Sequence, residues 1–538
     1  MNKTSCPFIL RIMKTRADHW ADITADKIIR EKGDKELYVC ASGITPSGTV
    51  HIGNFREIIS VDLVVRALRD RGRRVRFIYS WDDYDVFRKV PTNMPNAEML
   101  SEYLRKPITL TPDPYGVQES YARHNEKEIE ELLPLVGINP EYIYQAEAYR
   151  SSAYAEGIRA ALGHRDALRK ILNEYREKNK LGQDWWPVTV FCNSCQRDKT
   201  RVTGWDGENV LSYSCDSCGH TEDADLRSTG AVKLLWRVDW PMRWAREHVD
   251  FEPAGKDHHS RGGSFDTGKK IAHEVYRFPS PTTFAYDFIR IKGRGGKISS
   301  SSGEVVSLKE VLEVYQPEVV RYLFASTRPN SEFAISFDLD VIKIYEDYDR
   351  CERIYFEAEA VSEKKAARLR RIYELSQVKE VPAALPQQVP FRHLCNLLQV
   401  NEGNIEAMLD AMPELAEPDR GRLAVRAACA WNWIRTYAPP DFRFSLRSLD
   451  GPAVSLTQTE AEAVRRFRED LEQHLDDYDE KRLSEAIYDT AREAGLEPKD
   501  FFTVIYRLLI GRERGPRLAG FILIVGRRRV LERLESKT

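Results

Sequence analysis

The stretch TPSGTVHIGN at residues 45–54 decides the fold, because it joins a predicted strand to a predicted helix. Before it, ELYVCASG (36–43) is a short apolar run ending in glycine, which is typical of a buried strand. After it, FREIISVDLVVRALRDRG (55–72) repeats apolar residues at helical spacing and ends on a glycine suited to a helix C-cap. RRVRFIYSWDD (73–83) predicts a second strand. This βαβ unit implies a parallel sheet covered by helices, and therefore an α/β fold.

The start of the predicted helix is a candidate binding site for phosphate. Free backbone N–H groups and the positive end of the helix dipole favour an anion there. Gly48 and Gly53 allow a ligand close to the backbone. His51 and Asn54 lie three residues apart, so both can donate hydrogen bonds to phosphate or ribose oxygens. In the alternative interpretation, His51 only caps the helix.

Other common sites are disfavoured by missing motifs. The βαβ unit lacks the G-x-x-x-x-G-K-[ST] pattern of a P-loop, and no G-x-G-x-x-G follows its first strand, which argues against NAD. No G-x-S-x-G elbow supports a hydrolase with a Ser/His/Asp triad.

A second loop, GRGGKISSSSG at 293–303, suits a negative charge that develops during a reaction. Its glycines predict mobility, and Lys297 with the hydroxyls of Ser299 and Ser300 supplies a cation and hydrogen-bond donors. Alone, this pattern is better explained as a flexible surface loop. Its occurrence together with residues 45–54 makes it a candidate part of the same site.

Composition limits the class of protein. The 538 residues are 42% hydrophobic and 30% charged, which argues against a disordered or fibrous chain. The longest apolar run, 521–525, is too short to cross a bilayer, and residues 1–20 lack the apolar core of a secretory signal. A net charge of −2 excludes a globally basic coat for nucleic acid. We expect a cytoplasmic protein without membrane contact.

Four of the nine cysteines form two C-x-x-C pairs, Cys192 with Cys195 and Cys215 with Cys218. Nineteen residues separate the pairs, a spacing at which four thiolates can surround Zn²⁺ tetrahedrally and leave no open position. We predict a structural zinc site, because metal binding supplies folding energy that a small insertion lacks. The alternative is a chance group of free cysteines.

The sequence pattern changes at two points along the chain. From about 91 to 229 the pattern loosens and includes the cysteine pairs, which we interpret as an insertion into the α/β domain. After about Phe337 the chain becomes helical and strongly charged, and the proline-rich stretch 378–390 predicts a linker between helical parts.

Several motifs resemble those of a known family. PSGTVHIGN (46–54) is similar to the HIGH signature of class I aminoacyl-tRNA synthetases, and KISSS (297–301) is similar to their KMSKS loop. SWDDYDVFRKVP, LLWRVDWPMRW, FEPAGKDH and the C-terminal GRERGPRLAGFILIVGRRRVLERL resemble class I lysyl-tRNA synthetases in particular. The resemblance covers nearly the whole chain.

Two positions depart from the superfamily pattern. Asn54 replaces the last histidine of HIGH, and Ser300 stands at the second lysine of KMSKS. Lys297 is therefore the only cation of the loop, so a mechanism with two loop lysines on the phosphates is not expected.

The resemblance implies an architecture and a reaction. It implies a Rossmann-like catalytic domain at 1–340, with a zinc ribbon at 188–222 inside the insertion, and an all-α anticodon-binding region at 341–538. Lysine and ATP, with Mg²⁺, would give lysyl-adenylate, and the 3′ end of tRNA(Lys) would take the lysyl group. A carboxylate ionised at neutral pH needs no general base, so positioning and charge neutralisation can supply catalysis.

The resemblance also implies site residues. The expected catalytic residues are His51, Asn54, Lys297, Ser299 and Ser300. The expected ATP-binding residues are Pro46, Gly48, His51, Gly53, Asn54, Asp257, His258 and Lys297. The expected amino-acid pocket contains Gly43, Thr45, one of Trp236 and Trp240, His258 and Tyr286.

An acid must hold the lysine ammonium group. Asp82, Asp83 and Asp85 follow the second strand, at the edge where open α/β sheets bind ligands, and Asp83 is included in the predicted pocket. Glu57 and Asp239 are further candidates. Any one of these acids can instead cap a loop or pair with a neighbouring cation.

Two further regions carry weaker expectations. Some family members have a second metal site; here Asp113 and His124 are present, but Val117 and Gln118 replace the other positions, so we predict no such site. Near the C-terminus, arginines at 512, 514, 517 and 527–529 form a basic run suited to tRNA phosphates.

Three alternative functions remain open. The chain could be a class I synthetase for another amino acid, such as glutamate or cysteine, or a small-molecule nucleotidyltransferase. It could also be a non-catalytic tRNA-binding homologue, although the intact His51, Asn54, Lys297 and Ser299 argue against that.

Overall fold

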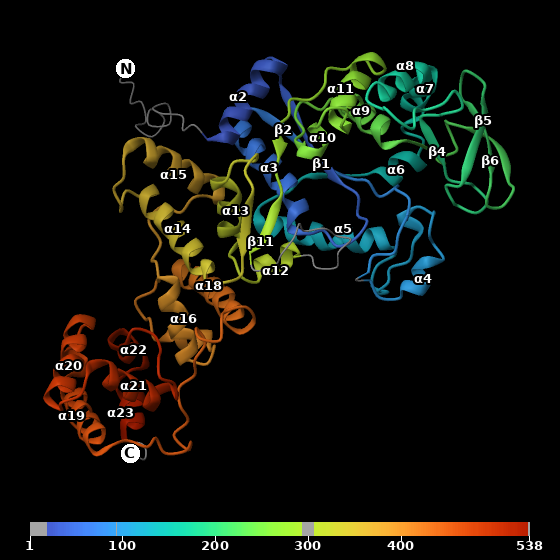
Figure 1. Ribbon diagram of the computed structural model, residues 1–538. Helices are drawn as coiled ribbons and strands as arrows, with labels where there is room; N and C mark the ends of the chain where they lie inside the picture. The colour runs from blue at the N-terminus through green and yellow to red at the C-terminus, as the bar shows by residue number, and fades with distance from the viewer. Residues whose placement is uncertain (1–18, 93, 293–305, 536–538) are drawn as a thin grey trace, which may run out of the picture. The chain divides into compact units, whose positions relative to one another are not determined.

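A parallel sheet forms around the predicted βαβ unit (Figure 1). The computed structural model describes residues 19–92, 94–292 and 306–535. Strands β1 (Leu37–Ile44), β2 (Arg74–Trp81) and β3 (Glu141–Tyr144) pair in that order, all parallel. Helix α3 (Ile52–Arg69) crosses from β1 to β2, and Gly72 follows its end with φ 72°. The predicted α/β class is confirmed.

The sheet continues on the far side of β1 through short segments. Phe251 bridges in parallel to both Cys40 of β1 and Thr282. Just beyond, β9 (Ala254–Gly255) pairs in parallel with β10 (Ala285–Tyr286). The FEPAGKDH segment and the chain around Tyr286 therefore reach the same carboxyl edge of the sheet as Gly43.

The insertion carries its own antiparallel sheets. Strands β5 (Thr200–Trp205), β6 (Val210–Cys215) and β7 (Thr221–Asp225) form one sheet, and β4 (Val188–Val190) pairs with β8 (Val232–Leu234). The range 91–229 is not insertion throughout, because β3 lies within it and belongs to the parallel sheet. A strand of four residues with a polar first position has too weak a pattern to reveal this.

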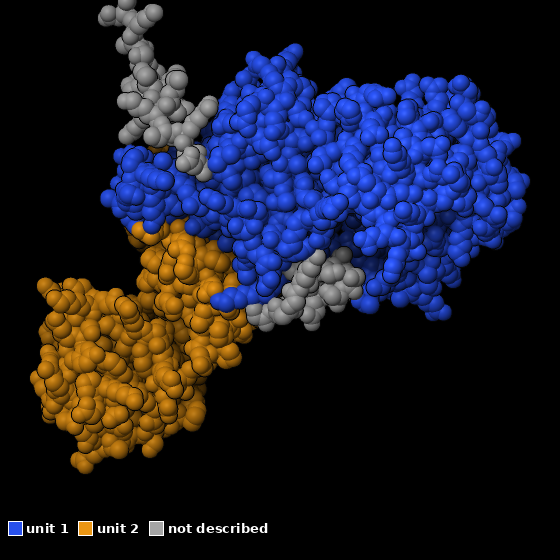
Figure 2. Space-filling view, turned by 45° about the horizontal axis from the view of Figure 1, so that its top comes forward, with its two compact units in different colours: residues 1–312, 317–335, 351–381 blue, residues 313–316, 336–350, 382–538 orange. Residues whose placement is uncertain are grey.

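Helices and one more strand pair complete the first of two compact units, 1–312, 317–335 and 351–381 (Figure 2). Strands β11 (Ile289–Lys292) and β12 (Phe333–Ser336) pair with each other. The helices are α2 (Trp20–Lys32), α4 (Ala97–Ser101), α5 (Tyr121–Leu132), α6 (Gln145–Arg150), α7 (Ala155–Gly163), α8 (Arg165–Asn173), α9 (Trp236–Glu247), α10 (Lys256–His259), α11 (Ser264–Glu274), α12 (Leu308–Leu312), α13 (Pro317–Ser326) and α15 (Glu363–Ser376).

The second unit comprises 313–316, 336–350 and 382–538, and its described elements from α16 onward are helical. Its C-terminal helices enclose a core that includes Phe467, Phe501 and Phe521. The helices are α16 (Phe391–Val400), α17 (Ile405–Asp410), α18 (Glu417–Thr436), α19 (Gln458–His474), α20 (Glu480–Glu493), α21 (Pro498–Ile510), α22 (Leu518–Val525) and α23 (Arg527–Glu535); α14 (Asp340–Tyr355) contributes its residues 340–350.

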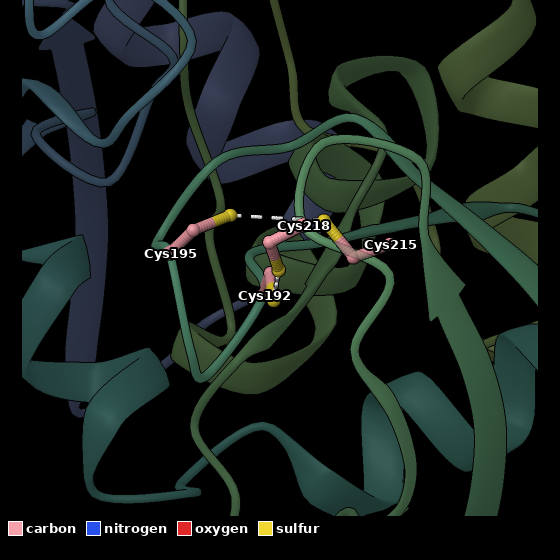
Figure 3. A group of neighbouring side chains, drawn as sticks. All are labelled: Cys192, Cys195, Cys215 and Cys218. Atoms are coloured by element: carbon pink, nitrogen blue, oxygen red, sulfur yellow. Dashed lines mark hydrogen bonds between the residues drawn. The ribbon is translucent and has the colours of Figure 1, made fainter.

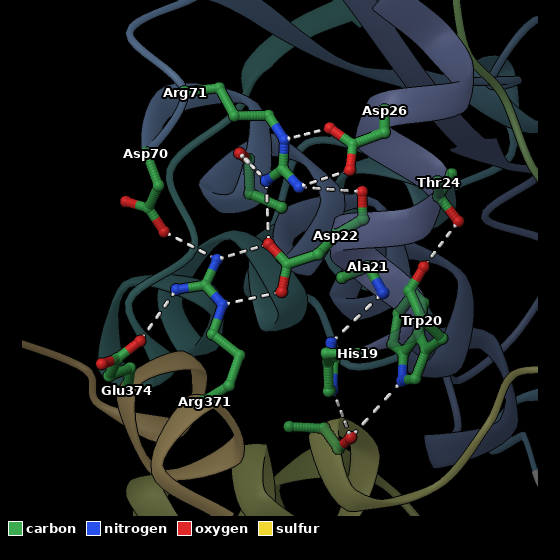
Figure 4. Close-up of polar contacts among 12 residues, drawn as sticks. His19, Trp20, Ala21, Asp22, Thr24, Asp26, Asp70, Arg71, Arg371 and Glu374 are labelled. Atoms are coloured by element: carbon green, nitrogen blue, oxygen red, sulfur yellow. Dashed lines mark hydrogen bonds and ion pairs between the residues drawn. The ribbon is translucent and has the colours of Figure 1, made fainter. Parts of the chain in front are cut away.

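Helix α15 belongs to the first unit, although the sequence analysis assigned it to the C-terminal region. An ion-pair network holds it there (Figure 4). Asp22 of α2 accepts from Arg371 of α15 at 2.8 and 3.0 Å and from Arg71 at 2.8 Å. Asp26 binds the other edge of Arg71 at 2.6 Å. One buried carboxylate thus joins segments about 350 residues apart, a contact that periodicity cannot predict.

We expect Asp22→Asn to lower the free energy of unfolding by about 2–3 kcal/mol, because Arg71 and Arg371 lose the buried carboxylate that they share and keep only the more exposed Asp26, Asp70 and Glu374. Burial raises the pKa of Asp22, but Arg371 and Arg71 lower it overall, so the contribution is complete at pH 7 and is lost in acid. Urea unfolding followed by circular dichroism measures the loss. Asp26→Asn is the control: its side chain is 43% exposed, so its loss should be below about 1 kcal/mol. Equal losses would contradict the assignment.

Candidate functional site

Two adjoining cavities open at the carboxyl edge of the sheet. The first lies among β1, β2, α9 and residues 249–258. The second lies between the start of α3 and residues 255–289. Four residues line both cavities, namely Ser42, Gly43, Glu57 and His258. One bound molecule can therefore place a group in each.

The start of α3 is held by a reciprocal pair of hydrogen bonds. His51 is the N-cap, and its Nδ1 accepts from the Asn54 N–H at 3.3 Å, while Asn54 Oδ1 accepts from the His51 N–H at 3.2 Å. Because Nδ1 accepts, we assign the ring proton to Nε2. Burial lowers the pKa of His51 to about 4, so the ring is a neutral donor at physiological pH. The capping and ligand-binding interpretations are thus compatible.

Gly53 is required by the ring it adjoins. A Cβ at this position would lie 2.8 Å from Nδ1 and Cε1 of His51, which is closer than real contacts allow. The glycine therefore lets the imidazole fold back over the first turn and form the cap.

The predicted ATP-binding residues divide into three groups. His51, Gly53, Asn54, Asp257 and His258 line the second cavity. Pro46 and Gly48 line neither cavity. Lys297, Ser299 and Ser300 lie outside the described residues.

Helix α5 holds the turn that contains Pro46. The Tyr121 hydroxyl donates to the Ser47 carbonyl at 2.9 Å, and Asn125 Nδ2 donates to the Pro46 carbonyl at 3.4 Å. These two contacts attach the turn before α3 to α5, and ATP binding by Pro46 and Gly48 stays a prediction.

Both candidate tryptophans line the first cavity. The rings of Trp236 and Trp240 stack with centroids 5.0 Å apart at 17°, and the His258 ring lies 5.7 Å from Trp240. Trp240 is 6% exposed, whereas Trp236 is 37% exposed and lies at the mouth. The stack forms an apolar wall suited to an aliphatic chain.

Four of the five acids proposed from the sequence to bind the lysine ammonium group already form ion pairs or hydrogen bonds within the protein. Asp82 pairs with Arg243, Asp85 pairs with Lys233 at 2.8 Å, and Asp239 accepts from the Tyr149 hydroxyl. The structure does not bring Asp83 to either cavity, because its carboxylate accepts the Ala146 N–H at the start of α6 at 2.8 Å. The predicted pocket residue Thr45 also lines neither cavity; its hydroxyl lies 3.5 Å from Asp85.

The half-buried Glu57 and the buried Glu252 remain as acids of the first cavity that form no ion pair within the described part of the chain. Glu57 accepts the Gly43 N–H at 3.0 Å and the Tyr286 hydroxyl. Glu252 accepts the indole N–H groups of Trp240 and Trp244 at 3.0 and 2.7 Å. Burial raises the pKa of both, that of Glu252 to about 7, so the cavity by itself disfavours their charged forms and a bound cation would favour them.

Glu252 was missed by the sequence analysis. The available signal was its place in FEPAGKDH, directly after Phe251, which bridges to β1. An acid that follows a strand at the carboxyl edge is a ligand-site candidate by the same rule that selected Asp82. Phe251 forms only isolated β-bridges, so the segment is too short for its hydrophobic pattern to predict a strand.

The four paired cysteines come together in one cluster (Figure 3). The sulfurs of Cys192 and Cys218 are 3.7 Å apart and those of Cys195 and Cys215 are 3.6 Å apart. A tetrahedral Zn²⁺ with bonds of about 2.3 Å requires sulfur separations of about 3.8 Å, so this donor set fits zinc.

Each pair sits on a tight turn of the same design. Gln196 donates its N–H to the Cys192 carbonyl at 2.7 Å, and Gly219 donates to that of Cys215 at 2.9 Å. Both residues have positive φ, 63° and 75°. The two turns therefore have the same backbone conformation, and each places two thiol groups close together.

The Asp113 carboxylate accepts hydrogen bonds from the backbone of its own loop. Its oxygens accept the N–H groups of Tyr115, Val117 and Gln118 at 2.8–3.0 Å, and Nδ1 of His124 lies 3.2 Å away. The carboxylate closes the turn between α4 and α5.

Part of the C-terminal basic run is engaged within the second unit. Arg527 pairs with Asp476 at 2.7 Å, and Arg529 donates to the Val400 carbonyl at 3.0 Å. Arg514 and Arg517 are exposed. Among the described residues, none of the helices combines the length and the apolarity needed to span a bilayer.

Comparisons with known proteins agree with the motifs. A family model described as tRNA synthetases class I (K) matches residues 18–379, and an anticodon binding domain matches 442–537. A Lysine--tRNA ligase of Treponema pallidum is 56% identical, over 95% of this chain and 97% of that protein. One of Thermococcus kodakarensis is 45% identical over 96% and 99%. Among solved structures, a glutamate tRNA ligase from Elizabethkingia meningosepticum covers 93% of this chain and 98% of that chain, with a TM-score of 0.43 and 13% identity.

We expect Cys192→Ser to abolish zinc binding, because three thiolates cannot close the tetrahedron, and to lower the melting temperature. Elemental analysis should find one zinc per chain in the unchanged protein and none in the variant. Cys395→Ser, which removes a buried thiol of α16, controls for thiol loss and should keep the zinc. Zinc retained at full occupancy in Cys192→Ser would refute the site.

We expect His51→Ala to lower kcat/KM for ATP by about 100-fold, because it removes a donor in a water-poor site. The cap itself should cost only about 1 kcal/mol of stability. Since the pKa of His51 is about 4, the factor should be the same at pH 6 and pH 8. Thr457→Ala removes an equivalent capping box from α19 and should leave the kinetics unchanged. A factor that differs between pH 6 and pH 8 would show that the ring titrates in this range and would contradict the neutral ring.

Proposed function

This chain belongs to the class I (K) family of tRNA synthetases. From that membership we propose that it catalyses the ATP-dependent ligation of lysine to tRNA and that the two cavities bind lysine and ATP. The observation that carries this proposal is a buried cavity with two carboxylates, Glu57 and Glu252, lacking a cationic partner among the described residues, beside a second cavity at a helix start. The first accepts an ammonium group, and the second accepts phosphates.

The geometry supports one orientation of the lysine. Its ammonium group lies against Glu57 and Glu252, and its methylene chain follows the stacked rings of Trp236 and Trp240. Its carboxylate then points past Gly43 toward the second cavity. A Cβ on Gly43 would lie 2.8 Å from the Ser80 carbonyl, so a side chain there would displace the wall of the passage.

Activation needs no base from the protein. A lysine carboxylate oxygen attacks the α-phosphorus of ATP, the bond to the β-phosphate oxygen breaks, and pyrophosphate leaves. The Nε2–H of His51 and the side-chain amide of Asn54 hydrogen-bond phosphate or ribose oxygens, and the positive end of the α3 dipole favours their negative charge. Lys297, Ser299 and Ser300, outside the described residues, complete the proposed catalytic set. Mg²⁺ on the triphosphate would neutralise part of its charge.

The transfer step uses the same cavity. A hydroxyl of the 3′-terminal adenosine attacks the lysyl carbonyl, and AMP leaves with the bonding electrons. The four thiolates would hold a structural Zn²⁺, which takes no part in either step. We further propose that tRNA contacts include the C-terminal arginines, and that the protein acts in the cytoplasm, where translation takes place.

The pocket argues against glutamate as the substrate. A substrate carboxylate would be buried beside Glu57 and Glu252, and the cation of this cavity, Arg243, is already bound by Asp82. ATP–pyrophosphate exchange against a panel of amino acids, with tRNA present, tests the function. Lysine should support exchange and glutamate should not. Exchange with glutamate alone would overturn the specificity, and exchange with none would favour a non-catalytic homologue.

We expect Glu252→Gln to lower kcat/KM for lysine by about 30- to 150-fold, because it leaves the ammonium without one buried partner. In the unchanged enzyme this constant should rise between pH 6 and pH 8, since the carboxyl of Glu252 has a pKa of about 7 and must ionise to bind the cation. The variant should lose that rise. Asp83→Asn is the matched control and should keep both the lysine KM and the pH profile. An unchanged lysine KM in Glu252→Gln would refute the pocket.

A further inference from the structure

Arg56 is a buried cation on α3 that faces away from both cavities. It is 2% exposed, and its guanidinium donates to four main-chain carbonyls. Nη1 donates to Phe288 at 3.0 Å, and Nη2 donates to Pro329 at 2.7 Å, Ser331 at 2.8 Å and Arg328 at 3.2 Å. The plane also lies 5.2 Å from the centre of the Phe333 ring.

The charge of Arg56 is balanced by carbonyl dipoles. Within the described part of the chain it forms no ion pair, and the nearby Asp287 carboxylate is bound by Lys256 at 2.6 Å. Burial lowers the pKa of Arg56 to about 10, so the group stays charged at neutral pH. A cation buried among carbonyls is stable only if they remain in place around it, so the contact specifies their positions.

These carbonyls connect the two walls of the second cavity. One wall is the start of α3, with His51, Asn54 and Glu57; the other is the backbone of residues 286–289. Glu57 joins the walls from the cavity side through the Tyr286 hydroxyl. Arg56, the preceding residue, joins them from behind through Phe288 and through the 328–331 turn.

The 328–331 turn is itself attached to the second wall. The Asp287 N–H donates to the Pro329 carbonyl at 2.9 Å, and that same oxygen accepts from Arg56. The guanidinium therefore determines the separation of the walls at two linked points. The next strand, β11, runs from this wall directly into residues 293–305.

We propose that Arg56 is a positioning residue for amino-acid activation: it sets the distance between the helix that binds the phosphates and the wall that faces them. The proposal rests on the proposed function. Lysine cannot replace it, because a single ammonium nitrogen cannot reach carbonyls spread over 288 and 328–331, whereas a planar fork can. Displacing either wall by about 1 Å is enough to reduce catalysis about 100-fold.

A purely structural arginine offers a matched control on the same helix. Arg66 also donates to two main-chain carbonyls, Gln377 at 2.6 Å and Gly137 at 3.0 Å, but at the end of α3 remote from the cavities. Arg66→Lys should therefore lower the melting temperature and leave kcat and KM of the folded enzyme unchanged.

Arg56→Lys and Arg56→Met should behave differently from this control. In lysine-dependent ATP–pyrophosphate exchange below the melting temperature, we expect Arg56→Lys to raise KM for ATP and to lower kcat, together reducing kcat/KM by about 10- to 100-fold. Circular dichroism establishes that the variant is folded. If Arg56→Met does not fold, Arg56→Lys alone decides the question.

Binding of a non-hydrolysable ATP analogue, measured by calorimetry without lysine, separates this proposal from the proposed function. Weaker binding in folded Arg56→Lys but not in Arg66→Lys supports the positioning role. Wild-type values of kcat, KM and analogue affinity in Arg56→Lys would overturn it, as would losses that match the unfolded fraction in both variants. If the unchanged protein binds the analogue but shows no exchange with lysine, the proposed function fails, and the binding comparison still tests Arg56.

Discussion

The hydrogen-bonded cap of α3 is the contact on which the site depends. His51 and Asn54 close the first turn reciprocally, so the asparagine that replaces the last histidine of the family signature has a defined role. The cap occupies Nδ1 of the imidazole and leaves its Nε2–H for a ligand, whereas the N–H groups of Ile52, Asn54 and Phe55 already donate to Val306 and His51. Arg56 and Glu57 follow within one turn and tie the helix to the opposite wall. A single helix turn therefore carries the proposed phosphate donors, the proposed spacer Arg56 and one acid of the proposed amino-acid pocket.

Charge balance distinguishes the residues that bind a substrate from those that build the site. Asp82 and Asp85 each have a buried cationic partner, so their charges are neutralised within the protein. Glu57 and Glu252 have donors but no ion pair among the described residues. Burying such carboxylates is unfavourable unless a cation arrives, and the raised pKa values express that cost. The electrostatics of the proposed pocket thus favour a cationic side chain.

Neutralisation of buried charged groups also joins distant segments of the chain away from the site. Asp22 accepts from two arginines and holds α15 in the first unit, and a metal held by the thiol cluster would join the two cysteine turns of the insertion. In both places a polar centre joins segments that are distant in sequence. These centres are strong because each donor has a partner, and they fail if one member is removed.

The sequence alone determined the βαβ unit, the helix start proposed to bind phosphate, the thiol cluster and the family, because each depends on local spacing: period 3.6 in the helix, two residues between cysteines, and short contiguous motifs. Only the tertiary structure decided which acids are free to bind a substrate. Asp83 was proposed and lies outside both cavities, whereas Glu252 was missed and lines one, because pairing with Arg243, Lys233 or a helix start depends on residues far away in the chain. The placement of β3, of α15 and of Arg56 was likewise decided by long-range contacts, since burial and charge pairing are properties of the folded chain that no sequence period encodes.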